Sequence, residues 1–367
     1  MSDFDKSFWN SSDNSILTSQ ASEGIDESLQ TAISDLELKG RIMISTSGTT
    51  SSPRLAVISK RAMLLSAKSV NEHLNICAKD KWLCCLPTTH VSGLSMHARS
   101  VSIGSSLIEF KSKWSPKEFW EMLNEYQITL CSFVPSQLHD LIKLNLRPNE
   151  QMRALIVGGD KLRDDVRAKA LDLGWPVLTT YGMTETCSQV ATEVFPGDGM
   201  KPLEIWSLRI SEVNGLEVKG DPLFDGYFEK VDDNWKFNAP FTDNGWFLTG
   251  DTGVLNNDRI SITGRKDEQI KIFGEKINIE LLRSFVAESY DHSITLIAAP
   301  DPRKGNRIVM VAENSSEAQR AFEHYNASVI SIERADELLI IDKLPRTSLG
   351  KIRIGKLYEI LENRSEA

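Results

Sequence analysis

Residues 45–54 read STSGTTSSPR and lie between two short apolar runs, residues 42–44 and 55–58. Short apolar runs bounded by Gly, Ser and Pro are typical of buried strands, so this stretch is predicted to be a hydroxyl-rich turn between two strands. Backbone N–H groups and hydroxyls in such a turn form a concave set of donors that suits phosphate oxygens, and Arg54 adds a permanent positive charge. On composition alone, a plain Ser/Thr loop is the alternative. A Walker A loop is excluded, because the Gly-x-x-x-x-Gly-Lys-[Ser/Thr] pattern is absent.

The composition is that of an ordinary globular chain. Its 367 residues suffice for two domains with a large core, and a hydrophobic share of 41% with a charged share of 25% is typical of globular folds. The formal net charge of −9, with no basic cluster to offset it, argues against a general nucleic-acid binder. We therefore expect no nucleic-acid partner.

Residues 1–40 are polar and acidic, without the apolar centre of a signal peptide, and no apolar run approaches the length of a membrane span. We therefore expect a cytoplasmic protein with no membrane partner. The cysteines number five and lack C-x-x-C spacing, which indicates reduced thiols rather than a disulfide framework or a zinc site. Cys187 is interpreted as a small packing residue.

Strand-like and helix-like segments alternate between residues 42 and 181. Ser59 and Ser115 are predicted helix N-caps, and Gly174 is a predicted helix end. Such alternation predicts an α/β fold with a largely parallel sheet flanked by helices, in which ligands collect at the carboxyl ends of the strands. The predicted strands are residues 55–58, 82–86, 107–110, 130–134, 154–157 and 177–179, and the predicted helices are residues 27–38, 61–74, 116–126 and 163–173.

After residue 181 the pattern changes to short strands with Gly and Asn turns, which predicts a small antiparallel β-subdomain. The charged stretch 264–268 then precedes a segment with its own helices and strands, which indicates a second compact unit of α+β type. We expect residues 1–266 to form the large domain and residues 267–367 the small one. The predicted strands are residues 208–213, 216–218, 246–248, 294–298, 308–311 and 337–341, with a hairpin turn at 232–234 and helices at 279–290 and 351–361.

Four further motifs follow the first stretch: YGMTET at 181–186, TGDTG at 249–253, GRKD at 264–267 and LPRTSLGK at 344–351. Each motif alone is weak. In this order and over most of the chain, the set resembles the ATP-dependent adenylate-forming superfamily of acyl-CoA synthetases, luciferases and peptide-synthetase adenylation domains. Residues 181–192 (YGMTETCSQVAT) and 90–95 (HVSGLS) look most like the acid–CoA ligases that act on o-succinylbenzoate in menaquinone biosynthesis.

The resemblance implies that o-succinylbenzoate is activated by ATP to an acyl-adenylate and then transferred to CoA, with Mg²⁺ as the metal. Family members usually carry a further subdomain before the phosphate loop, so this chain resembles a shortened version of the plan. A homo-oligomer is one way to cover the side left open. Two alternatives remain: an acid–CoA ligase for another aromatic or short-chain acid, and a degenerate nucleotide-binding homologue without turnover.

The resemblance also implies roles for residues at the nucleotide. A negative acid attacks a negative phosphate, so catalysis consists mainly of positioning and charge neutralisation. Glu185 is implied to bind Mg²⁺ and Thr184 to contact the α-phosphate, although an ordinary helix cap is the alternative reading of this pair. The other implied nucleotide contacts are Ser45, Thr46, Ser47, Gly48, Thr49, Thr50 and Arg54 to the phosphates, Gly158, Gly159 and Tyr181 to adenine, and Asp251 with Arg265 to the ribose.

In the resembled superfamily the small domain is a mobile lid. Lys351 is implied to bridge the attacking carboxylate and the α-phosphate, and Asp267 is implied to be the hinge of the lid rotation. Gly274 and Glu275 would line the tunnel for the pantetheine arm of CoA. A solvated surface lysine is the alternative for Lys351.

Residues 90–104 are predicted to be a loop that enters a helix, on which Ser92, Ser95 and Arg99 share one face. A diacid keeps a second carboxylate after the first is activated, and a buried carboxylate is costly unless a cation pairs with it. Arg99 is the predicted partner, with Ser92 as a neutral donor and His90 near the reacting carboxylate. A surface arginine with a salt-bridge partner is the alternative.

The phosphate loop departs from the superfamily pattern Gly-x-Pro-Lys-Gly at three positions. Ser51, Arg54 and Leu55 replace the first Gly, the Lys and the last Gly. Arginine preserves the charge but differs from lysine in shape and donor geometry. These changes bear on nucleotide affinity more than on reaction type.

Overall fold

The structure is a computed structural model that describes residues 3–18, 26–46, 54–212, 214–232, 234–265, 269–290, 293–313, 317–347 and 350–365. The chain divides into two compact units. The first comprises Met1–Ile210, Glu217–Leu248 and Val254–Ser261, and the second comprises Ser211–Leu216, Thr249–Gly253 and Ile262–Ala367. The boundary predicted between residues 266 and 267 lies outside the described residues and stays a prediction. No helix in the described ranges is both long and apolar enough to cross a membrane.

A seven-stranded sheet forms the centre of the first unit. In spatial order its strands are β10 (Lys201–Pro202), β9 (Ser188–Thr192), β8 (Val177–Met183), β7 (Ala154–Val157), β6 (Leu130–Phe133), β4 (Lys81–Cys84) and β5 (Ser106–Glu109). The five strands from β8 to β5 are parallel, and β9 and β10 continue the sheet antiparallel. Strands β6 and β7 are buried along their whole length, as strands covered on both faces must be. The predicted α/β fold with a largely parallel sheet is confirmed.

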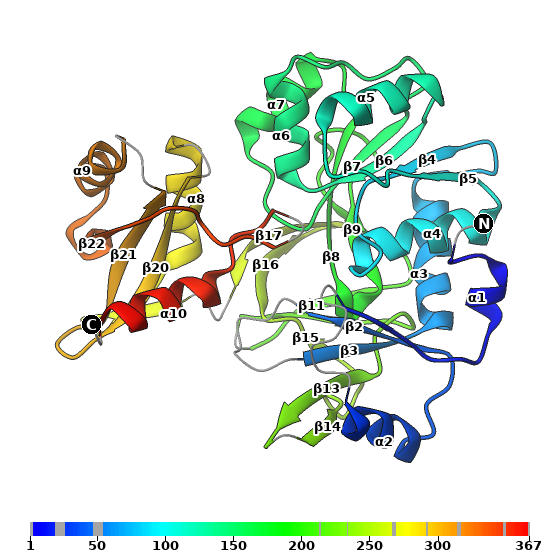
Figure 1. Ribbon diagram of the computed structural model, residues 1–367, viewed down its shortest axis with the longest axis horizontal. Coiled ribbons are helices and arrows are strands. Elements are labelled where there is room, and N and C mark those ends of the chain that lie inside the picture. Colours follow the sequence, from blue (N-terminus) through cyan, green and yellow to red (C-terminus); the bar gives the residue numbers. More distant parts are fainter. Residues whose placement is uncertain are drawn as a thin grey trace. The chain divides into compact units, whose positions relative to one another are not determined.

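Helices cover both faces of this sheet (Figure 1). They are α3 (Lys60–His73) and α4 (Val91–Ile103) on one face, and α5 (Pro116–Glu125), α6 (Pro135–Lys143) and α7 (Asp164–Asp172) on the other. Phe119, Leu138 and Val166 come one from each of α5, α6 and α7, and they pack with Phe133 and Val157 of the sheet in one hydrophobic core. The apolar face of each helix is therefore fixed against the parallel strands.

The predicted helix ends are confirmed where a side chain makes the cap. Ser59 Oγ accepts from the Ala62 N–H at 2.9 Å at the start of α3, and Ser115 Oγ accepts from the Glu118 N–H at 3.4 Å at the start of α5. Both hydroxyls satisfy a backbone donor that the helix leaves without an internal partner.

We expect Ser59→Ala to lower the free energy of unfolding by about 1 kcal/mol, because the cap bond to Ala62 is lost. Urea denaturation followed by circular dichroism measures the change. Ser34→Ala is the matched control, since the Ser34 hydroxyl is exposed and donates within its own helix to the Gln30 carbonyl. Equal changes in both variants would contradict the capping role.

A second sheet lies beside the first within the same unit, and it corrects the placement of residues 55–58 among the parallel strands. Its order is β1 (Ser15–Leu17), β2 (Arg41–Ser45), β3 (Arg54–Ser59), β13 (Gly226–Val231) and β14 (Asn234–Asn238). β2 and β3 are antiparallel, because the short connection between them lets the chain only fold back on itself. The predicted hairpin at 232–234 joins β13 and β14.

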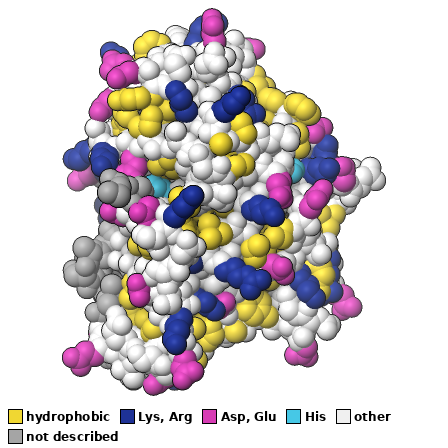
Figure 2. All heavy atoms as spheres, turned by 90° about the vertical axis from the view of Figure 1, so that its right-hand side faces the viewer, with side chains coloured by type: hydrophobic (Ala, Val, Ile, Leu, Met, Phe, Trp, Pro, Cys, Tyr) yellow, Lys and Arg dark blue, Asp and Glu magenta, His cyan; other side chains and the backbone are white. Residues whose placement is uncertain are grey.

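Short helices and strands complete the first unit. Helix α2 (Glu27–Asp35) packs Leu29 and Ile33 against Met43, Val57 and Trp235 of the second sheet. The remaining elements are α1 (Lys6–Asn10) and a three-stranded sheet of β11 (Ser207–Ile210), β12 (Leu216–Lys219) and β15 (Phe247–Leu248). The residues of the hairpin of β16 (Asp251–Asn256) and β17 (Arg259–Arg265) are divided between the two units. On the face drawn in Figure 2, basic and acidic side chains are interspersed.

The second unit is a mixed sheet with helices on both faces. The strands are β18 (Gln269–Ile272), β19 (Glu275–Asn278), β20 (Ile294–Asp301), β21 (Gly305–Glu313) and β22 (Ala335–Ile341), and the helices are α8 (Ile279–Ser289), α9 (Ala318–Ser328) and α10 (Ile354–Ser365), with a single turn η2 (Ser331–Glu333). Val286 and Tyr325 belong to one core and Leu357 and Leu361 to another, so α8 and α9 lie opposite α10. The sequence pattern missed α9 and started the last helix three residues early, since α10 begins at Ile354.

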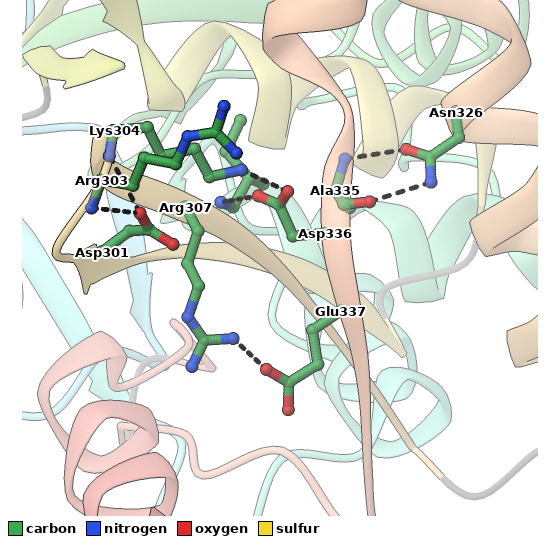
Figure 3. A network of polar contacts seen from close by, with 9 residues as sticks. Asp301, Arg303, Lys304, Arg307, Asn326, Ala335, Asp336 and Glu337 are labelled. Atoms are coloured by element: carbon green, nitrogen blue, oxygen red, sulfur yellow. Dashed lines mark hydrogen bonds and ion pairs between the residues drawn. The ribbon is translucent and has the colours of Figure 1, made fainter. Parts of the chain in front are cut away.

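A polar network holds three strands of the second unit together (Figure 3). Asp301 accepts from the backbone N–H groups of Arg303 and Lys304, both at 2.9 Å, which closes the turn from β20 to β21. Ion pairs from Lys304 to Asp336 and from Arg307 to Glu337 then tie that turn and β21 to β22. These charges have partners in the fold and serve its structure.

Candidate active site

The turn predicted to hold phosphates is closed at its base by β2 and β3. Ser45 ends β2, and the Thr46 N–H donates to the Arg54 carbonyl at 3.1 Å. Arg54 Nε donates to Thr46 Oγ1 at 3.4 Å. The two strands predicted on either side of this turn are confirmed as an antiparallel pair. Ser47, Gly48, Thr49 and Thr50, as well as Ser51, lie outside the described residues, so their contacts to phosphate stay predictions.

The motif at 181–186 forms a tight reversal between β8 and β9. Thr184–Thr186 make a single 3-10 turn, η1, after which Cys187 and Ser188 have positive φ values of 54° and 113°. Thr186 Oγ1 accepts from the Met183 N–H at 3.1 Å and donates to the Ser188 carbonyl at 2.9 Å, so the side chain bridges the reversal. Thr184 and Glu185 therefore begin a short capped 3-10 turn, so a helix-cap reading of this pair stays open and their contacts to a nucleotide stay predictions.

Gly182 is required by the same reversal. A Cβ atom at this position would lie 1.8 Å from the Ser188 carbonyl oxygen, far inside contact distance. Only glycine lets β8 and β9 approach so closely, and this approach sets where Thr184 and Glu185 stand. Cys187 is buried, as predicted for a packing residue.

Glu185 stands at the centre of a cluster made by three elements. Its residue is 9% exposed, and Tyr227 Oη donates to its Oε1 at 2.6 Å. Arg54 Nη2 lies 3.9 Å from the same Oε1, and Arg54 Nη1 lies 3.8 Å from Glu229 Oε1. The guanidinium carbon of Arg54 is 3.9 Å from the centre of the Tyr227 ring. Glu185, Arg54, Tyr227 and Glu229 therefore form one charged cluster, which we call the Glu185 cluster.

The pairing of β3 with β13 builds this cluster. Ala56 is opposite Tyr227 and Arg54 is opposite Glu229 in the register, so alternate residues of β13 face the Arg54 side chain. Burial and the neighbouring Glu185 carboxylate raise the pKa of Tyr227, so its hydroxyl remains a donor. Sequence reasoning missed Tyr227 and Glu229. A tyrosine in a short strand gives no sign of a site until its pairing partner is known.

The predicted acid-binding residues lie on and before helix α4. His90 is the residue before the helix, and the Ser95 hydroxyl donates to the Ser92 carbonyl at 2.9 Å. The Ser92 hydroxyl is buried and has no hydrogen-bond partner in the described part of the chain. Arg99 is 2% exposed, which makes the alternative of a surface arginine wrong.

Arg99 points toward the motif segment. Its Nη2 donates to Ser188 Oγ at 2.9 Å, and its guanidinium carbon lies 5.8 Å from the Trp82 ring centre. Its Nε has no hydrogen-bond partner among the described residues, and none of their carboxylates pairs with it. Burial lowers the pKa of Arg99 to about 10, so the guanidinium is still charged at neutral pH. A buried cation of this kind is suited to an anion that the chain does not itself supply.

Gly158 and Gly159 follow β7 at the carboxyl edge of the parallel strands, the edge at which ligands were predicted to collect. A Cβ atom on Gly158 would lie 2.6 Å from Thr180 Cγ2, so the backbone here packs closely against the residue before Tyr181. Gly159 has a φ of +83°, which favours glycine. The structure therefore brings this turn and the start of the motif together.

Asp251 and Arg265 belong to the second unit and form a pair there. Arg265 Nη1 lies 3.5 Å from Asp251 Oδ1, and the Asp251 residue is 8% exposed. The Asp251 N–H donates to Thr249 Oγ1 at 3.1 Å, which fixes the backbone after Gly250. The predicted association of Arg265 with Asp251 is present. Their contact with a ribose stays a prediction.

Lys351 follows a closed loop of the second unit. The Thr347 N–H donates to the Lys351 carbonyl at 2.7 Å, and Arg346 Nη1 donates to the Gly350 carbonyl at 3.0 Å. These bonds hold the backbone on both sides of the lysine. Phe273 and Gly274, which has a φ of +86°, form the turn between β18 and β19, and Glu275 begins β19. Asp267 lies outside the described residues, so its role as a hinge stays a prediction.

The residues present fit a magnesium ion that is shared with a nucleotide. No group of three or more His, Cys, Asp or Glu side chains that could hold a metal occurs in the described ranges. Mg²⁺ is usually bound through one or two carboxylates together with substrate phosphates and water. Glu185, which lies beside Arg54, could supply one such carboxylate. The five cysteines are free thiols, as predicted.

Comparison with known proteins adds independent findings. Residues 36–208 match the family model of AMP-binding enzymes. The 2-succinylbenzoate–CoA ligase of Enterococcus faecalis is 28% identical over 341 residues, which cover 87% of this chain and 69% of that ligase.

Two solved structures of one enzyme also match. The o-succinylbenzoate CoA synthetase (MenE) of Bacillus subtilis in complex with the acyl-adenylate intermediate OSB-AMP has a TM-score of 0.75 at 26% identity, covering 86% of this chain and 68% of that one. The same enzyme in complex with ATP and magnesium has a TM-score of 0.73 at 25% identity, covering 86% and 69%.

The fold, the order of the motifs and the matches to known proteins all point to the same class of enzyme. The chain is similar to adenylate-forming enzymes over most of its length, and the resemblance predicted from its motifs is confirmed. Within that class it is similar to the 2-succinylbenzoate–CoA ligases.

Proposed function

We propose that this protein is a 2-succinylbenzoate–CoA ligase. A carboxylate of o-succinylbenzoate attacks the α-phosphate of ATP and displaces pyrophosphate, and the CoA thiolate then attacks the acyl-adenylate and displaces AMP. The ligases that it resembles support the reaction. The single observation that carries the choice of acid is that Arg99 is buried and pairs with no carboxylate of the described residues.

Arg99 suits the carboxylate that a diacid keeps after activation. Its contact with Ser188 places the guanidinium beside the segment that carries Thr184 and Glu185, so an acid bound there would have its other end near the nucleotide turn. A carboxylate would satisfy the open Nε donor and neutralise a charge that is otherwise costly to bury. The open Ser92 hydroxyl offers a neutral donor on the same helix. His90, at the start of the helix, would stand nearest the reacting carboxylate.

The remaining residues divide between nucleotide and lid. The turn from Ser45 to Arg54 would hold the phosphates, Tyr181 with the Gly158 turn would hold adenine, and Asp251 would accept from the ribose. Glu185 would bind the magnesium ion, which neutralises charge on the phosphates when it is bound. We also propose that residues 267–367 act as the lid, in which Lys351 serves adenylation and the Gly274 turn serves the CoA thiolate.

CoA is the proposed acyl acceptor. A cytoplasmic location is proposed as well, because the reaction consumes ATP and CoA and the cysteines are free thiols. A homo-oligomer remains a proposal that light scattering would test.

The proposal is tested with purified protein, ATP, Mg²⁺ and CoA. We expect pyrophosphate release that depends on o-succinylbenzoate, and a CoA thioester of matching mass by mass spectrometry. Benzoate, succinate and 2-methylbenzoate serve as control acids and should give little of either product. Faster thioester formation with another acid would assign a different ligase, and ATP turnover without any acid-derived product would contradict ligase activity.

A further inference from the structure

Arg54 begins β3 at the base of the predicted phosphate turn, and its guanidinium also lies near the Glu185 carboxylate. We propose that in the nucleotide-free protein Arg54 is the resident counter-ion of Glu185, held on the Tyr227 ring, and that it must leave this carboxylate before a divalent metal binds there. Metal binding and phosphate binding are thereby coupled. The inference rests on the proposed nucleotide site and adds an exchange of cations to it.

The Arg54 side chain makes several contacts at the same time. It lies 3.9 Å from Glu185 Oε1, 3.8 Å from Glu229 Oε1 and 3.9 Å from the Tyr227 ring centre. Its side chain is only 28% exposed and that of Glu185 is 12% exposed, so solvent screens their attraction only in part. A cation bound by two carboxylates and one aromatic face stays near them in the absence of a stronger anion.

Tyr227 contributes to both sides of this arrangement. Its hydroxyl donates to Glu185 Oε1, which fixes the carboxylate plane and leaves Oε2 for a further ligand. Its ring carries the guanidinium. A planar guanidinium stacks on an aromatic ring and pairs with a carboxylate at the same time, whereas a lysine ammonium is a compact, strongly hydrated charge. Arginine is therefore suited to this position between the ring and the carboxylate, and a lysine would bind there less tightly.

The exchange follows from electrostatics. Without nucleotide, the Glu185 carboxylate is already neutralised by Arg54. A divalent metal that binds there is repelled by the positive charge of Arg54. Nucleotide phosphates change the balance, because Arg54 begins β3 at the base of the phosphate turn and can pair with them instead. The metal then finds a free carboxylate and phosphate oxygens together. By linkage, each ligand raises the affinity for the other.

Mn²⁺ binding to the full-length protein without nucleotide, acid or CoA tests the proposal. Loss of the aqueous Mn²⁺ signal in electron paramagnetic resonance measures the bound metal. We expect Arg54→Gln to bind Mn²⁺ about tenfold more tightly than the wild type, because one like charge is removed from the carboxylate. ATP should increase the Mn²⁺ affinity of the wild type more than it increases that of Arg54→Gln, because the variant lacks the cation that moves from Glu185 to the phosphates.

Lys230→Gln is the matched control. It makes the same change in net charge on β13, the strand paired with β3, but Lys230 points to the face of β13 opposite to Tyr227 and Glu229 and pairs with Asp26 at 3.0 Å. Its Mn²⁺ affinity should equal that of the wild type. Equal Mn²⁺ affinities in wild type and Arg54→Gln, or an equal gain in Lys230→Gln, would overturn the proposal.

Arg54→Lys is the second variant and guards against a folding defect in Arg54→Gln. It keeps the charge for phosphate but loses the stacked plane, so ATP affinity should largely survive while nucleotide-free Mn²⁺ binding tightens about threefold. Nucleotide-free Mn²⁺ affinity unchanged in Arg54→Lys and in Arg54→Gln would show that Arg54 is no counter-ion. Thioester formation by the wild type is scored separately, so failure of the exchange and failure of the ligase assignment remain distinguishable.

Discussion

Lys351→Ala should remove acyl-adenylate formation and leave the conversion of preformed acyl-adenylate to the CoA thioester largely intact. The lysine ammonium is proposed to neutralise charge between the attacking carboxylate and the α-phosphate, and that charge exists only in the first half-reaction. Loss of one such preorganised group typically costs about 10²–10³ in rate. Pyrophosphate release measures the first step, and synthetic acyl-adenylate with CoA measures the second.

The loop that carries Lys351 makes this test specific. Its backbone is held by Thr347 on one side and by the Arg346 contact to Gly350 on the other, so truncation of the side chain leaves the loop closed. Lys356→Ala is the matched control, because Lys356 lies on α10 in a surface pair with Glu359 at 2.8 Å. An equal fall in both half-reactions of Lys351→Ala would mean that the lysine is structural.

The parallel sheet was predictable because its signals are local. Short apolar runs such as 130–134 and 154–157 match β6 and β7, and Ser59 and Ser115 mark helix starts by a hydroxyl that any helix N-terminus can use. The assignment of 55–58 to that sheet failed because strand type alone does not name a partner. β3 pairs with β13, some 170 residues later, and only the folded chain shows this.

Some residues of the candidate site were likewise predicted from the sequence, and others were not. Glu185, Asp251 and Arg99 came from motifs and from charge placed at helical spacing. Tyr227 and Glu229 could be found only from the pairing of β13 with β3, because the sequence of a strand does not identify a partner strand far away in the chain. The helix α9 was missed because its buried residues, Ala318, Ala321 and Tyr325, make a weak apolar stripe with small side chains.

Arg99 also links stability to function in a way that sequence could not show. Arg99 is a cation at 2% exposure, and among the described residues its side chain hydrogen-bonds to a serine hydroxyl alone. Such a cation contributes little to the stability of the folded state, because its desolvation is unfavourable. Residues that are costly to fold and that meet a ligand's charge are typical of binding sites, where function is maintained at the expense of stability. A structural arginine would instead show an acid partner among its neighbours.

Arg99→Met should therefore raise KM for o-succinylbenzoate sharply and leave both KM for ATP and the melting temperature nearly unchanged. Methionine fills a similar volume without a charge, so little packing is lost. The lost charge-assisted bond is expected to cost about 1.5–3 kcal/mol, which corresponds to about 10- to 150-fold in affinity. Steady-state kinetics and thermal unfolding of the same preparations measure both quantities.

Monocarboxylic analogues make the result decisive. 3-Benzoylpropionate keeps only the aliphatic carboxylate, and 2-butanoylbenzoate keeps only the ring carboxylate. The analogue that is a substrate must keep the carboxylate that is activated, so it lacks the carboxylate that Arg99 would bind. In the wild type that analogue should bind less tightly than the diacid, and in Arg99→Met the two should become nearly equal. Arg99→Lys retains the charge and should recover part of the preference, although not the bidentate geometry. A lower melting temperature with the same loss for diacid and monoacid would instead make Arg99 a structural residue, and the choice of acid would then need another anchor.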